Sequence, residues 1–357
     1  MTTPFWPRPP ERYPGRLPEK ADVLVIGGGI TGVSLLHHLA QRGLDAVLVE
    51  RSHLASGASG RNAGFLLAGV ANCYAQAARQ YGRARAHDIW AMTVENHAEE
   101  IGAIGGQEVG HRQLGSITLA SGAGEVDQLA ESAELMREDG FSVTWDGQAL
   151  FNPVDGEVIP SLLVGAFARQ AAAGAIREGV DVTGIESSAR ASDVIVTSNG
   201  DECRAGCVIL ATNAYTPQLV PAIPITPTRA QMLASQPERA RLCDFPTYSH
   251  FGYRYWRQMP TGEMLVGGWR DTSFETEVGY DERPTPAIQT RLENHLRKMG
   301  ADGEVTHRWA GTMGFTESGL PIVGPVDGMK NVYVCAGYNG HGMGFAFMSA
   351  KQLVGML

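Results

Sequence analysis

Short apolar runs and stretches of helical spacing alternate along the chain, and their order predicts a mixed α/β protein. The opening unit shows this most clearly. Residues 23–26 are an apolar run, a glycine-rich turn follows, and a helical stretch leads to a second apolar run that ends at Glu50. This order predicts a strand, a turn, a helix and a second strand.

The rest of the chain continues the alternation. A four-proline segment at residues 217–227 cannot be regular structure and is interpreted as a crossover between domains. A helix that reaches Leu357 without a stop signal suggests that the natural chain continues further. The pattern predicts helices over residues 74–105, 126–139, 161–173 (amphipathic) and 284–299, strands over 116–120, 179–186, 193–198, 207–211 and 332–336, and a hairpin of 252–258 with 264–269.

Length and order together predict two domains. The chain has 357 residues, of which 43% are hydrophobic, enough to bury a sizeable core. A Rossmann-like unit opens the chain, related segments recur in its middle, and the last strand and helix resemble them. We therefore expect a discontinuous nucleotide-binding domain (residues 1–90, 150–216 and 305–357) carrying an inserted mixed β-sheet substrate domain (residues 91–149 and 217–304).

Composition excludes several classes. A formal net charge of −9 argues against nucleic acid as a partner. No apolar stretch is long enough to span a membrane, and residues 1–20 are rich in Pro and Arg without a signal core. We expect an extended surface arm there and a cytoplasmic protein. The five cysteines show no spacing typical of a metal site, so free thiols and no metal are expected.

The first turn predicts dinucleotide binding. Gly27 permits the tight turn, Gly29 lets the backbone approach a pyrophosphate, and Gly32 lets helix and strand pack closely. Phosphates would lie at the helix N-terminus, where N–H groups are free and the dipole favours negative charge. Glu50 follows Gly32 by 18 residues, the usual place of a ribose-binding carboxylate, which favours FAD or NAD over NADP.

Two further glycine-rich segments favour a flavin. Residues 54–64 combine small residues with Arg61, whose fork suits a phosphate, and their density lets backbone run against a flat ring. Residues 337–344 form a turn between a strand and a helix, so that their N–H groups can face negative charge on a reduced flavin. His341 lies in this turn and is a candidate to contact flavin or substrate.

These segments, together with residues 180–186, 209–213, 309–316 and 319–324, resemble in order the FAD-dependent amine and amino-acid oxidoreductases of the D-amino-acid oxidase superfamily. That group includes sarcosine oxidase, glycine oxidase and γ-glutamylputrescine oxidase. The resemblance implies a Rossmann-like FAD-binding domain and FAD as the cofactor. The FAD-binding residues that we expect are Gly27, Gly29, Ile30, Thr31, Gly32, Glu50, Arg51, Ser59, Gly60, Arg61, Asn62, Ala63, Gly64, Phe65, Val182, Ala211, Thr212, Gly337, Gly340, His341, Gly342, Met343 and Gly344.

The chain departs from this family at three places. Met313 stands where sarcosine oxidase has its flavin-attaching cysteine, which favours non-covalent FAD, although Cys335 is left open. Met313 also stands where glycine oxidase has its carboxylate-binding arginine, and a second expected arginine aligns with Gly340. Arg254, Arg257 or Arg270 are possible replacements, or else surface arginines. Sarcosine oxidase uses a strand lysine to promote reaction with oxygen, and no lysine lies near the matching position, Leu265, so a quinone or a protein is an alternative electron acceptor to oxygen.

The resemblance implies oxidation of an amine or amino-acid C–N bond, with hydride passing to flavin N5 and hydrolysis of the resulting imine. Tyr255 and His341 are the candidate catalytic residues, and Tyr253, Arg257 and Met313 are candidates to bind substrate. Tyr253, Tyr255 and Arg257 alternate onto one face of the predicted hairpin. The alternatives are another FAD oxidoreductase, a nicotinamide-dependent dehydrogenase, and a flavin-binding subunit without turnover.

Overall fold

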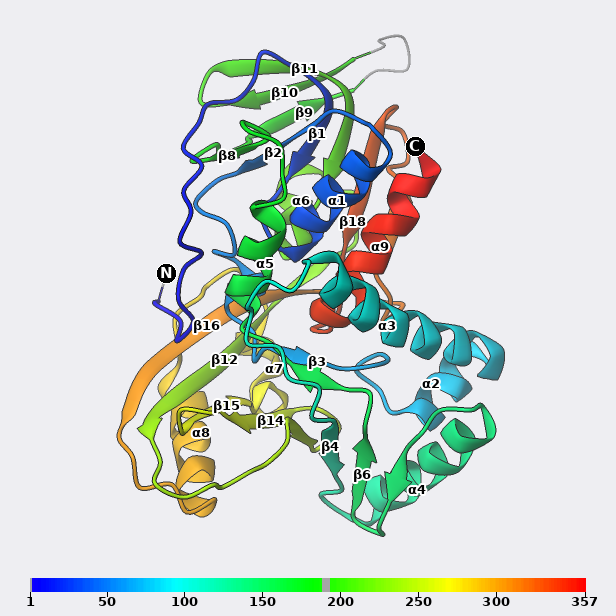
Figure 1. Ribbon diagram of the computed structural model, residues 1–357, viewed down its shortest axis with the longest axis vertical. Helices are drawn as coiled ribbons and strands as arrows, with labels where there is room; N and C mark the ends of the chain where they lie inside the picture. Colours follow the sequence, from blue (N-terminus) through cyan, green and yellow to red (C-terminus); the bar gives the residue numbers. More distant parts are fainter. Residues whose placement is uncertain (1, 188–192) are drawn as a thin grey trace.

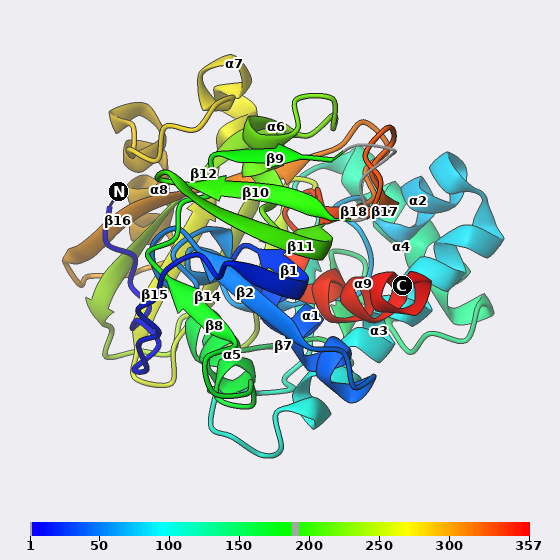
Figure 2. The same cartoon turned by 90° about the horizontal axis from the view of Figure 1, so that it is seen from above.

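The computed structural model describes residues 2–187 and 193–357, so residue 1 of the expected arm lies outside the described part. Two large sheets lie one above the other along the long axis of the molecule (Figure 1). Helices cover one side of the upper sheet, as a view from above also shows (Figure 2). The chain passes between the two sheets several times, so each is built from separated segments.

The first sheet is largely parallel, with the order β17-β18-β11-β1-β2-β8. Its central strands are the apolar runs of the sequence, and both faces are buried, as parallel sheets require. Strands β10 and β11 form an antiparallel hairpin, and β9 pairs with the other edge of β10. The strands are β1 (Lys20–Ile26), β2 (Ala46–Glu50), β8 (Ile176–Glu178), β9 (Gly184–Glu186), β10 (Val194–Ser198), β11 (Asp201–Leu210), β17 (Ile322–Pro325) and β18 (Val332–Ala336).

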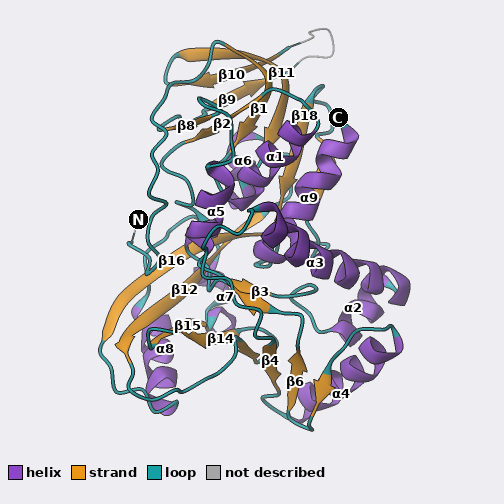
Figure 3. Ribbon diagram, viewed as in Figure 1, coloured by secondary structure: helices purple, strands orange, loops and turns teal. Residues whose placement is uncertain are grey.

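Four helices pack together on one face of the first sheet (Figure 3). Helix α1 (Ile30–Gln41) contacts α5 (Pro160–Ala168) and α9 (Gly342–Met356), and α3 (Arg83–Ala103) lies against α9. Their apolar side chains form the largest core cluster. Among the residues that the structure describes, no helix is both long and apolar enough to cross a lipid bilayer.

The second sheet has the order β16-β12-β15-β14-β13-β4-β6-β5. Helix α8 (Pro286–Lys298) covers one face, where Leu292 and Leu296 pack against Trp256 and Val266. Its strands are β4 (Ser116–Leu119), β5 (Thr144–Trp145), β6 (Ala149–Asn152), β12 (Thr226–Pro237), β13 (Thr247–Ser249), β14 (Arg254–Gln258), β15 (Glu263–Gly268) and β16 (Val305–Phe315).

Shorter elements connect these layers. A ribbon of β3 (Phe65–Leu66) and β7 (Gly156–Glu157) lies between the two sheets, and α2 (Tyr74–Tyr81) packs on α4 (Ala123–Glu138). The remaining single turns are η1 (Ala58–Gly60), η2 (Asn213–Tyr215), η3 (Arg270–Thr272), α6 (Thr216–Leu219) and α7 (Phe274–Glu277).

Several predicted elements differ in detail. Of the strand expected at 179–186, only residues 184–186 form a strand, β9, because β8 ends at Glu178 and Gly179, at φ +81°, turns the chain between the two. The helix expected at 74–105 breaks at Gly82, where φ is +86°. Helix α5 is shorter than expected and buried on nearly all sides instead of amphipathic. The segment 217–227 is not wholly irregular, since Pro217 lies in the first turn of α6, where its missing N–H costs nothing.

The domain boundaries remain a prediction, with two corrections from strand pairing. Residues 150–152 were assigned to the nucleotide-binding domain, but they belong to β6 and pair with β4 in the second sheet. Strand β16 pairs along most of its length with β12 and belongs to the second sheet, although residues 305–357 were assigned to the nucleotide-binding domain. The last strands, β17 and β18, do pair within the first sheet. A register between strands far apart in sequence has no local signal, which explains the misplaced boundary.

The N-terminal arm is partly buried instead of lying only on the surface. Trp6 is 4% exposed and belongs to the apolar cluster between the sheets. Its indole N–H donates to the carbonyl of Asn62 at 2.7 Å. The Thr2 carbonyl accepts a hydrogen bond from Arg61, and the Thr2 hydroxyl accepts one from the N–H of Ala310. The arm therefore supports the loop that contains residues 61 and 62.

Glu100 on α3 yields a stability prediction. Its side chain is fully buried, neither carboxylate oxygen has a partner among the described residues, and burial raises its pKa well above the ordinary 4.5. The folded protein therefore holds a proton that the unfolded chain releases, so this group costs stability as pH rises above about 4.5. Glu100→Gln should stabilise the FAD-loaded protein by about 1–3 kcal/mol at pH 8 and much less at pH 5.

Glu99→Gln on the same helix is the control. Glu99 pairs with Lys351 at 2.7 Å, and this partner lowers its pKa, so its loss should slightly destabilise the protein at pH 8. Denaturant unfolding at both pH values measures the two variants. An equal effect of Glu100→Gln at pH 5 and pH 8 would contradict the assignment.

Candidate functional site

A cavity of about 620 Å³ extends between the two sheets. One end lies at the turn after β1, and the other lies against β13, β14 and the turn before α9. Ligands of open α/β sheets bind at the carboxyl ends of the strands, which is where the first of these ends lies. Its volume lies within the range of about 300–1,000 Å³ that is usual for small-molecule and cofactor sites.

Glycine turns let backbone form the wall of the first end. Gly27 has a φ of +115°, and a Cβ there would lie 2.7 Å from the carbonyl oxygen of Ala211. Glu50 is held in place because one carboxylate oxygen accepts from the N–H of Gly28 at 2.8 Å and the other from Ser56. Helix α1 begins here, and its first-turn N–H groups have no intrahelical acceptor. This end combines an oriented carboxylate with the N–H donors of the first helical turn, of which that of Ile30 donates to the Ser59 hydroxyl at 2.9 Å.

These features fit the ADP half of a dinucleotide. A Cβ on Gly29 would lie 2.8 Å from the Ser59 hydroxyl, so only glycine leaves this approach open. Arg51 stacks on the ring of Tyr215 at 4.1 Å and also lines this end, as does Val182. The residues present can therefore hold a pyrophosphate at the helix N-terminus and a ribose at Glu50.

The loop 54–64 lines the middle of the cavity, and its side chains hold the loop itself. Arg61 was expected to offer its fork to a phosphate. Instead, three of its N–H groups donate to the carbonyls of Ser56, Ala310 and Thr2 at 2.8–2.9 Å. Asn62 likewise accepts from the N–H of Gly64 at 2.7 Å. The phosphate role of Arg61 is therefore not supported, because its donors are engaged by protein carbonyls.

Arg257 was expected to bind substrate, but it does not line the cavity. Its guanidinium is 1% exposed and donates to the carbonyls of Ala63, Gly64 and Val158 at 3.0–3.2 Å. Its Nε lies 2.9 Å from a carboxylate oxygen of Glu157, which is equally buried. Burial lowers its pKa to about 10, so it remains charged at neutral pH. Arg257 holds the loop that lines the cavity and does not face a substrate.

The turn 337–344 closes the cavity from the opposite side. Asn213, at the end of β11, accepts from the N–H of Gly337 at 2.9 Å. Asn339 accepts from the N–H of Thr316 at 2.9 Å and donates its own backbone N–H to Gly314 at 2.9 Å. These bonds join the turn to β11 and β16. Helix α9 then begins directly after His341, with its N-terminus at the cavity.

Aromatic side chains dominate the second end. Tyr255 lies across from Gly267 on β15, where a Cβ would lie 2.1 Å from the tyrosine ring, so glycine makes room for it. Tyr248 on β13 faces Tyr255, with ring centroids 5.9 Å apart. Neither hydroxyl has a partner among the described residues, and both side chains line the cavity. Two phenol groups are thus available to a ligand.

Apart from Arg270, which lines this end, the histidine and the two facing tyrosines here are uncharged at neutral pH. Burial lowers the pKa of His341 to about 4 and raises that of Tyr255 to about 12. Burial also raises the pKa of Tyr248. A neutral imidazole and two neutral phenols can donate or accept hydrogen bonds without repelling an amine.

The structure brings most expected site residues together. The cavity is lined by Gly27, Gly29, Ile30, Thr31, Glu50, Arg51, Ser59, Arg61, Asn62, Ala63, Phe65, Val182, Ala211, Thr212, Tyr253, Tyr255, Met313, Gly340, His341, Gly342, Met343 and Gly344. Gly32, Gly60, Gly64 and Gly337 lie behind this wall, where a Cβ would clash with neighbouring atoms at 1.9–2.5 Å. They shape the wall without forming its surface.

Sequence reasoning missed several lining residues. Tyr248 and Phe251 were not expected, and Phe315 and Tyr215 were not singled out. Tyr248 comes from a strand of three residues, too short to show a period. Arg270 lines the cavity, although it had been one of three equal candidates.

A nucleotide-binding sheet that shares a deep cavity with an aromatic second sheet defines a dinucleotide-dependent enzyme. The sequence profile of the DAO family, described as FAD dependent oxidoreductase, matches residues 22–356. The chain therefore belongs to this FAD-dependent family. The nicotinamide-dependent alternative is wrong.

Similar proteins agree with this membership. A probable oxidoreductase OrdL from Rhizobium meliloti is 30% identical, over 93% of this chain and 82% of that protein. A gamma-glutamylputrescine oxidoreductase from Escherichia coli is 26% identical, over 94% and 83%. The crystal structure of glycine oxidase from Geobacillus kaustophilus matches with a TM-score of 0.78 over 95% of both chains, at 20% identity. This last likeness confirms the predicted fold.

Arg257→Met should weaken the site through the loop. Removing Arg257 leaves the buried carboxylate of Glu157 with one cation, the partly exposed Arg112, in place of two, at a cost of about 1–3 kcal/mol of unfolding free energy. The carbonyls of residues 63 and 64 also lose their donor, so FAD affinity should fall by at least about tenfold. Denaturant unfolding and titration of the apoprotein with FAD measure both effects.

Arg79→Met is the matched control. Arg79 pairs with Glu131 at 2.6 Å, but both side chains are about half exposed, and such pairs contribute little. Its FAD affinity should equal that of the wild type. Unchanged FAD affinity in Arg257→Met would contradict the supporting role of Arg257.

Proposed function

We propose that this protein oxidises a C–N bond of an amine or amino acid. One observation carries the proposal: the cavity that fits a dinucleotide continues into an aromatic end with two neutral phenols, a neutral imidazole and one arginine. Membership of the FAD-dependent family supports it, as do similar proteins named for amine and amino-acid oxidation. The competing flavin-binding subunit without turnover has in its favour Met313 and Gly340, which stand where arginines were expected, and the lack of a lysine in the described lining; flavin reduction by an amine decides against it.

The expected cofactor residues divide by position. Gly27, Gly29 and Glu50 would hold the ADP half with the N-terminus of α1. Asn62, Ala63 and Phe65 would line the flavin ring on one side. The other edge of the ring would be covered by the N-terminus of α9 and the turn before it, which contribute Gly340, His341, Gly342, Met343 and Gly344.

FAD is proposed to be held without a covalent bond. None of the five cysteines, all of which are described, lines the cavity. Cys335 in particular is fully buried and has its sulfur 3.2 Å from the hydroxyl of Tyr338. Met313 occupies the lining position and cannot form a thioether link through a thiol.

When bound, FAD would supply the two-electron oxidant, with N5 as the acceptor of a hydride from the carbon beside the substrate nitrogen, and water would hydrolyse the imine product. The protein binds and orients the amine. Tyr255 and Tyr248 can accept hydrogen bonds from its N–H groups, and their rings exclude water. An amine in this apolar end loses its proton readily, since desolvation disfavours the charged form.

A cytoplasmic location remains a prediction from sequence. The electrons would then pass to oxygen or to another acceptor. The position near Leu265 is fully buried and apolar. No lysine lines the described cavity to assist a reaction with oxygen.

The direct test is anaerobic mixing of the FAD-loaded protein with sarcosine, glycine, D-amino acids, proline and polyamine derivatives. At least one class should bleach the absorption band of the bound flavin. Admission of air then distinguishes rapid recovery, expected of an oxidase, from slow recovery, expected of a dehydrogenase. Tyr255→Phe should bind FAD normally but slow the bleaching by about 10–100-fold, because the amine loses one orienting contact. A protein that binds FAD but is bleached by no amine would contradict the proposal.

The pH dependence of turnover should be set by the substrate amine and not by His341. His341 has a pKa lowered to about 4 by burial, so it is neutral throughout pH 6–9 and does not titrate there. The rise of kcat/KM with pH should therefore follow deprotonation of the substrate amine, near pH 9–10 for an ordinary amine. His341→Gln should lower kcat while the position of this rise stays fixed.

Substrates with different amine pKa values provide the control, because the rise should move with the amine. A rise near pH 6.5 that disappears in His341→Gln would show instead that the imidazole titrates during catalysis.

A further inference from the structure

A second, smaller cavity of about 100 Å³ lies beside the substrate end, and we call it the side chamber. It shares with the main cavity a wall that includes Tyr248, Phe251 and His341, so it lies next to the place proposed for the amine. Its other walls come from α2, α3 and α4 and from β4 and β6, strands near one edge of the second sheet (Figure 3). Its volume exceeds several-fold the space that one water molecule needs.

Two buried carboxylates line the side chamber, and the described part of the chain provides neither with a cation. Asp155 is 3% exposed, and its oxygens accept from the Ser116 hydroxyl at 2.6 Å and from the N–H of Ala68 at 2.9 Å. Glu125 is equally buried and accepts only from neutral groups, among them the N–H of Phe251 at 2.7 Å. No lysine or arginine is among the described lining residues.

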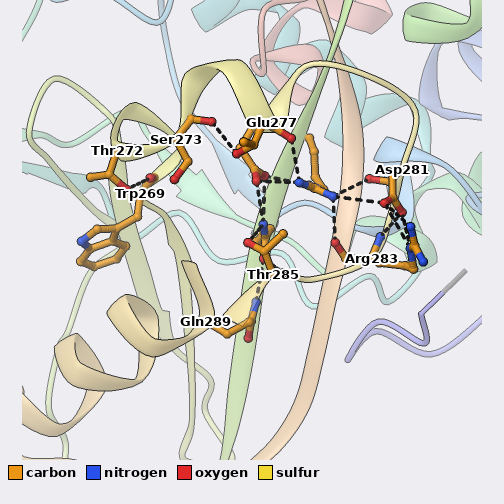
Figure 4. A network of polar contacts seen from close by, with 11 residues as sticks. Trp269, Thr272, Ser273, Glu277, Asp281, Arg283, Thr285 and Gln289 are labelled. Atoms are coloured by element: carbon orange, nitrogen blue, oxygen red, sulfur yellow. Dashed lines mark hydrogen bonds and ion pairs between the residues drawn. The ribbon is translucent and has the colours of Figure 1, made fainter. Parts of the chain in front are cut away.

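At two other sites, this protein pairs a buried carboxylate with arginine. Glu157 lies 2.9 Å from Arg257, and Glu277 lies 2.7 Å from Arg229 within a network of polar contacts (Figure 4). Buried charges are normally paired in this way, because a lone charge bears the full cost of desolvation. In the side chamber, burial instead raises the pKa of Asp155 to about 7, so that its charge is only partly formed at neutral pH. A cation that enters the chamber would favour the charged form.

Aromatic side chains contribute much of the remaining wall. Trp90 and Tyr74 are 5% and 1% exposed, and their ring centroids lie 4.9 Å apart. The faces of such rings attract cations. The indole N–H of Trp90 and the hydroxyl of Tyr248 have no hydrogen-bond partner among the described residues, so polar groups of the wall are available to a ligand. Carboxylates and aromatic rings without a competing cation are the combination that recognises an alkylammonium group.

The wall between the two cavities has no side chain at Gly252, which lines both. Apart from its chain neighbours, a Cβ on this residue would have only the carbonyl oxygen of Ala71 within 4 Å, at 3.7 Å. Asp155 is also close enough to Tyr248 for its charge to contribute to the raised pKa of that phenol. A chain that starts beside Tyr248 can therefore extend past Gly252 toward Asp155.

Charge distinguishes the side chamber from the main cavity. Arg270 lines the main cavity but not the chamber, so the shared wall separates it from a cation in the chamber. Glu100 and Glu178 are also buried without a cation among the described residues, but they line neither cavity. Burial keeps His341 uncharged, so it does not compensate a carboxylate at neutral pH. The other titratable side chains of the described chamber lining are Cys73, Tyr74, Glu125 and Tyr248.

We infer that the side chamber binds a second, distal ammonium group of the substrate, so that the protein selects diamines or diamino acids over amines of the same length without that group. Asp155 is the specificity-determining residue, and Glu125 adds negative charge. This inference rests on the proposed amine oxidation. It names the part of the substrate that lies away from the oxidised C–N bond.

The experiment uses pairs of amines that differ only in the distal ammonium: putrescine with butylamine, cadaverine with pentylamine, ornithine with norvaline, and lysine with norleucine. Anaerobic reduction of the flavin by each is measured in the FAD-loaded wild type and in Asp155→Asn. The wild type should prefer one diammonium member by at least about tenfold, the usual contribution of a hydrogen bond to a charged group. Asp155→Asn should lose most of this preference, through a slower reaction with the diammonium member.

A binding measurement provides a readout without turnover. The FAD-loaded protein is first reduced with dithionite in the absence of air, so that it cannot oxidise an amine. Calorimetry with both members of the preferred pair follows, in two buffers of different ionisation enthalpy. Because the pKa of Asp155 is about 7, the diammonium member should release about half a proton more than its partner at pH 7. This difference should disappear in Asp155→Asn.

Asp127→Asn is the matched control, because it makes the same change at an exposed carboxylate of α4. Its preference within each pair and its proton release should equal those of the wild type. FAD content and the flavin spectrum, measured for both variants, show whether the main cavity is intact.

The outcomes separate the two proposals. Equal reduction by both members of every pair, reduction only by amines outside these pairs, or an equal loss for both members in Asp155→Asn overturns the role of the side chamber and leaves amine oxidation intact. Binding of a diammonium member that depends on Asp155, without reduction by any amine, supports the chamber and overturns the proposed function.

A second variant decides if Asp155→Asn does not hold FAD. Asp155→Glu keeps the charge, but its longer side chain shortens the space that the chamber offers. In a series of diamines of increasing length, the preferred substrate should therefore shift to a shorter one. An unchanged preferred length in Asp155→Glu overturns the inference.

Discussion

The buried ion pair of Arg257 and Glu157 is the constraint on which the cavity depends. Both side chains are 1% exposed, so neither charge can be left alone without a large desolvation cost. Arg257 comes from β14 of the second sheet, Glu157 from the ribbon between the sheets, and the carbonyls that Arg257 also binds belong to the loop beside the flavin site. One guanidinium thus fixes the distance between the aromatic end and the cofactor loop.

Charge is distributed unevenly along the cavity. The nucleotide end has an oriented carboxylate and helix N–H groups, as a phosphate and a ribose require. The substrate end has neutral phenols, a neutral imidazole and one arginine between aromatic rings. The two positions where related enzymes were expected to bind a carboxylate, Met313 and Gly340, touch each other and form an apolar surface. Met313 and Gly340 thus provide no cation, whereas Arg270 on the neighbouring segment lines the cavity.

The sequence was informative wherever function depends on contiguous backbone. The three glycine-rich segments and Glu50 were placed correctly, because a tight turn between a strand and a helix is written in adjacent residues. Side-chain roles were less accessible. Arg61 meets Ala310 and Arg257 meets Gly64 across separations of 249 and 193 residues, so nothing nearby distinguishes a supporting arginine from a ligand-binding one. The same limit applies to Tyr248, to the register of β16 and to the buried helix α5, whose neighbours come from other parts of the chain.

The N-terminal arm has a consequence for the order of folding. Thr2 and Ala310 are joined by a hydrogen bond although 308 positions separate them, and Trp6 lies against the cofactor loop through Asn62 and against Arg257, at 5.4 Å. During synthesis the arm emerges first, yet its partner strand appears only near the end. Contacts of such high contact order form slowly, because a long loop must close before they stabilise anything. The cofactor loop should therefore reach its final shape among the last events of folding, and a newly made chain would stay unable to hold its flavin until its two ends have met.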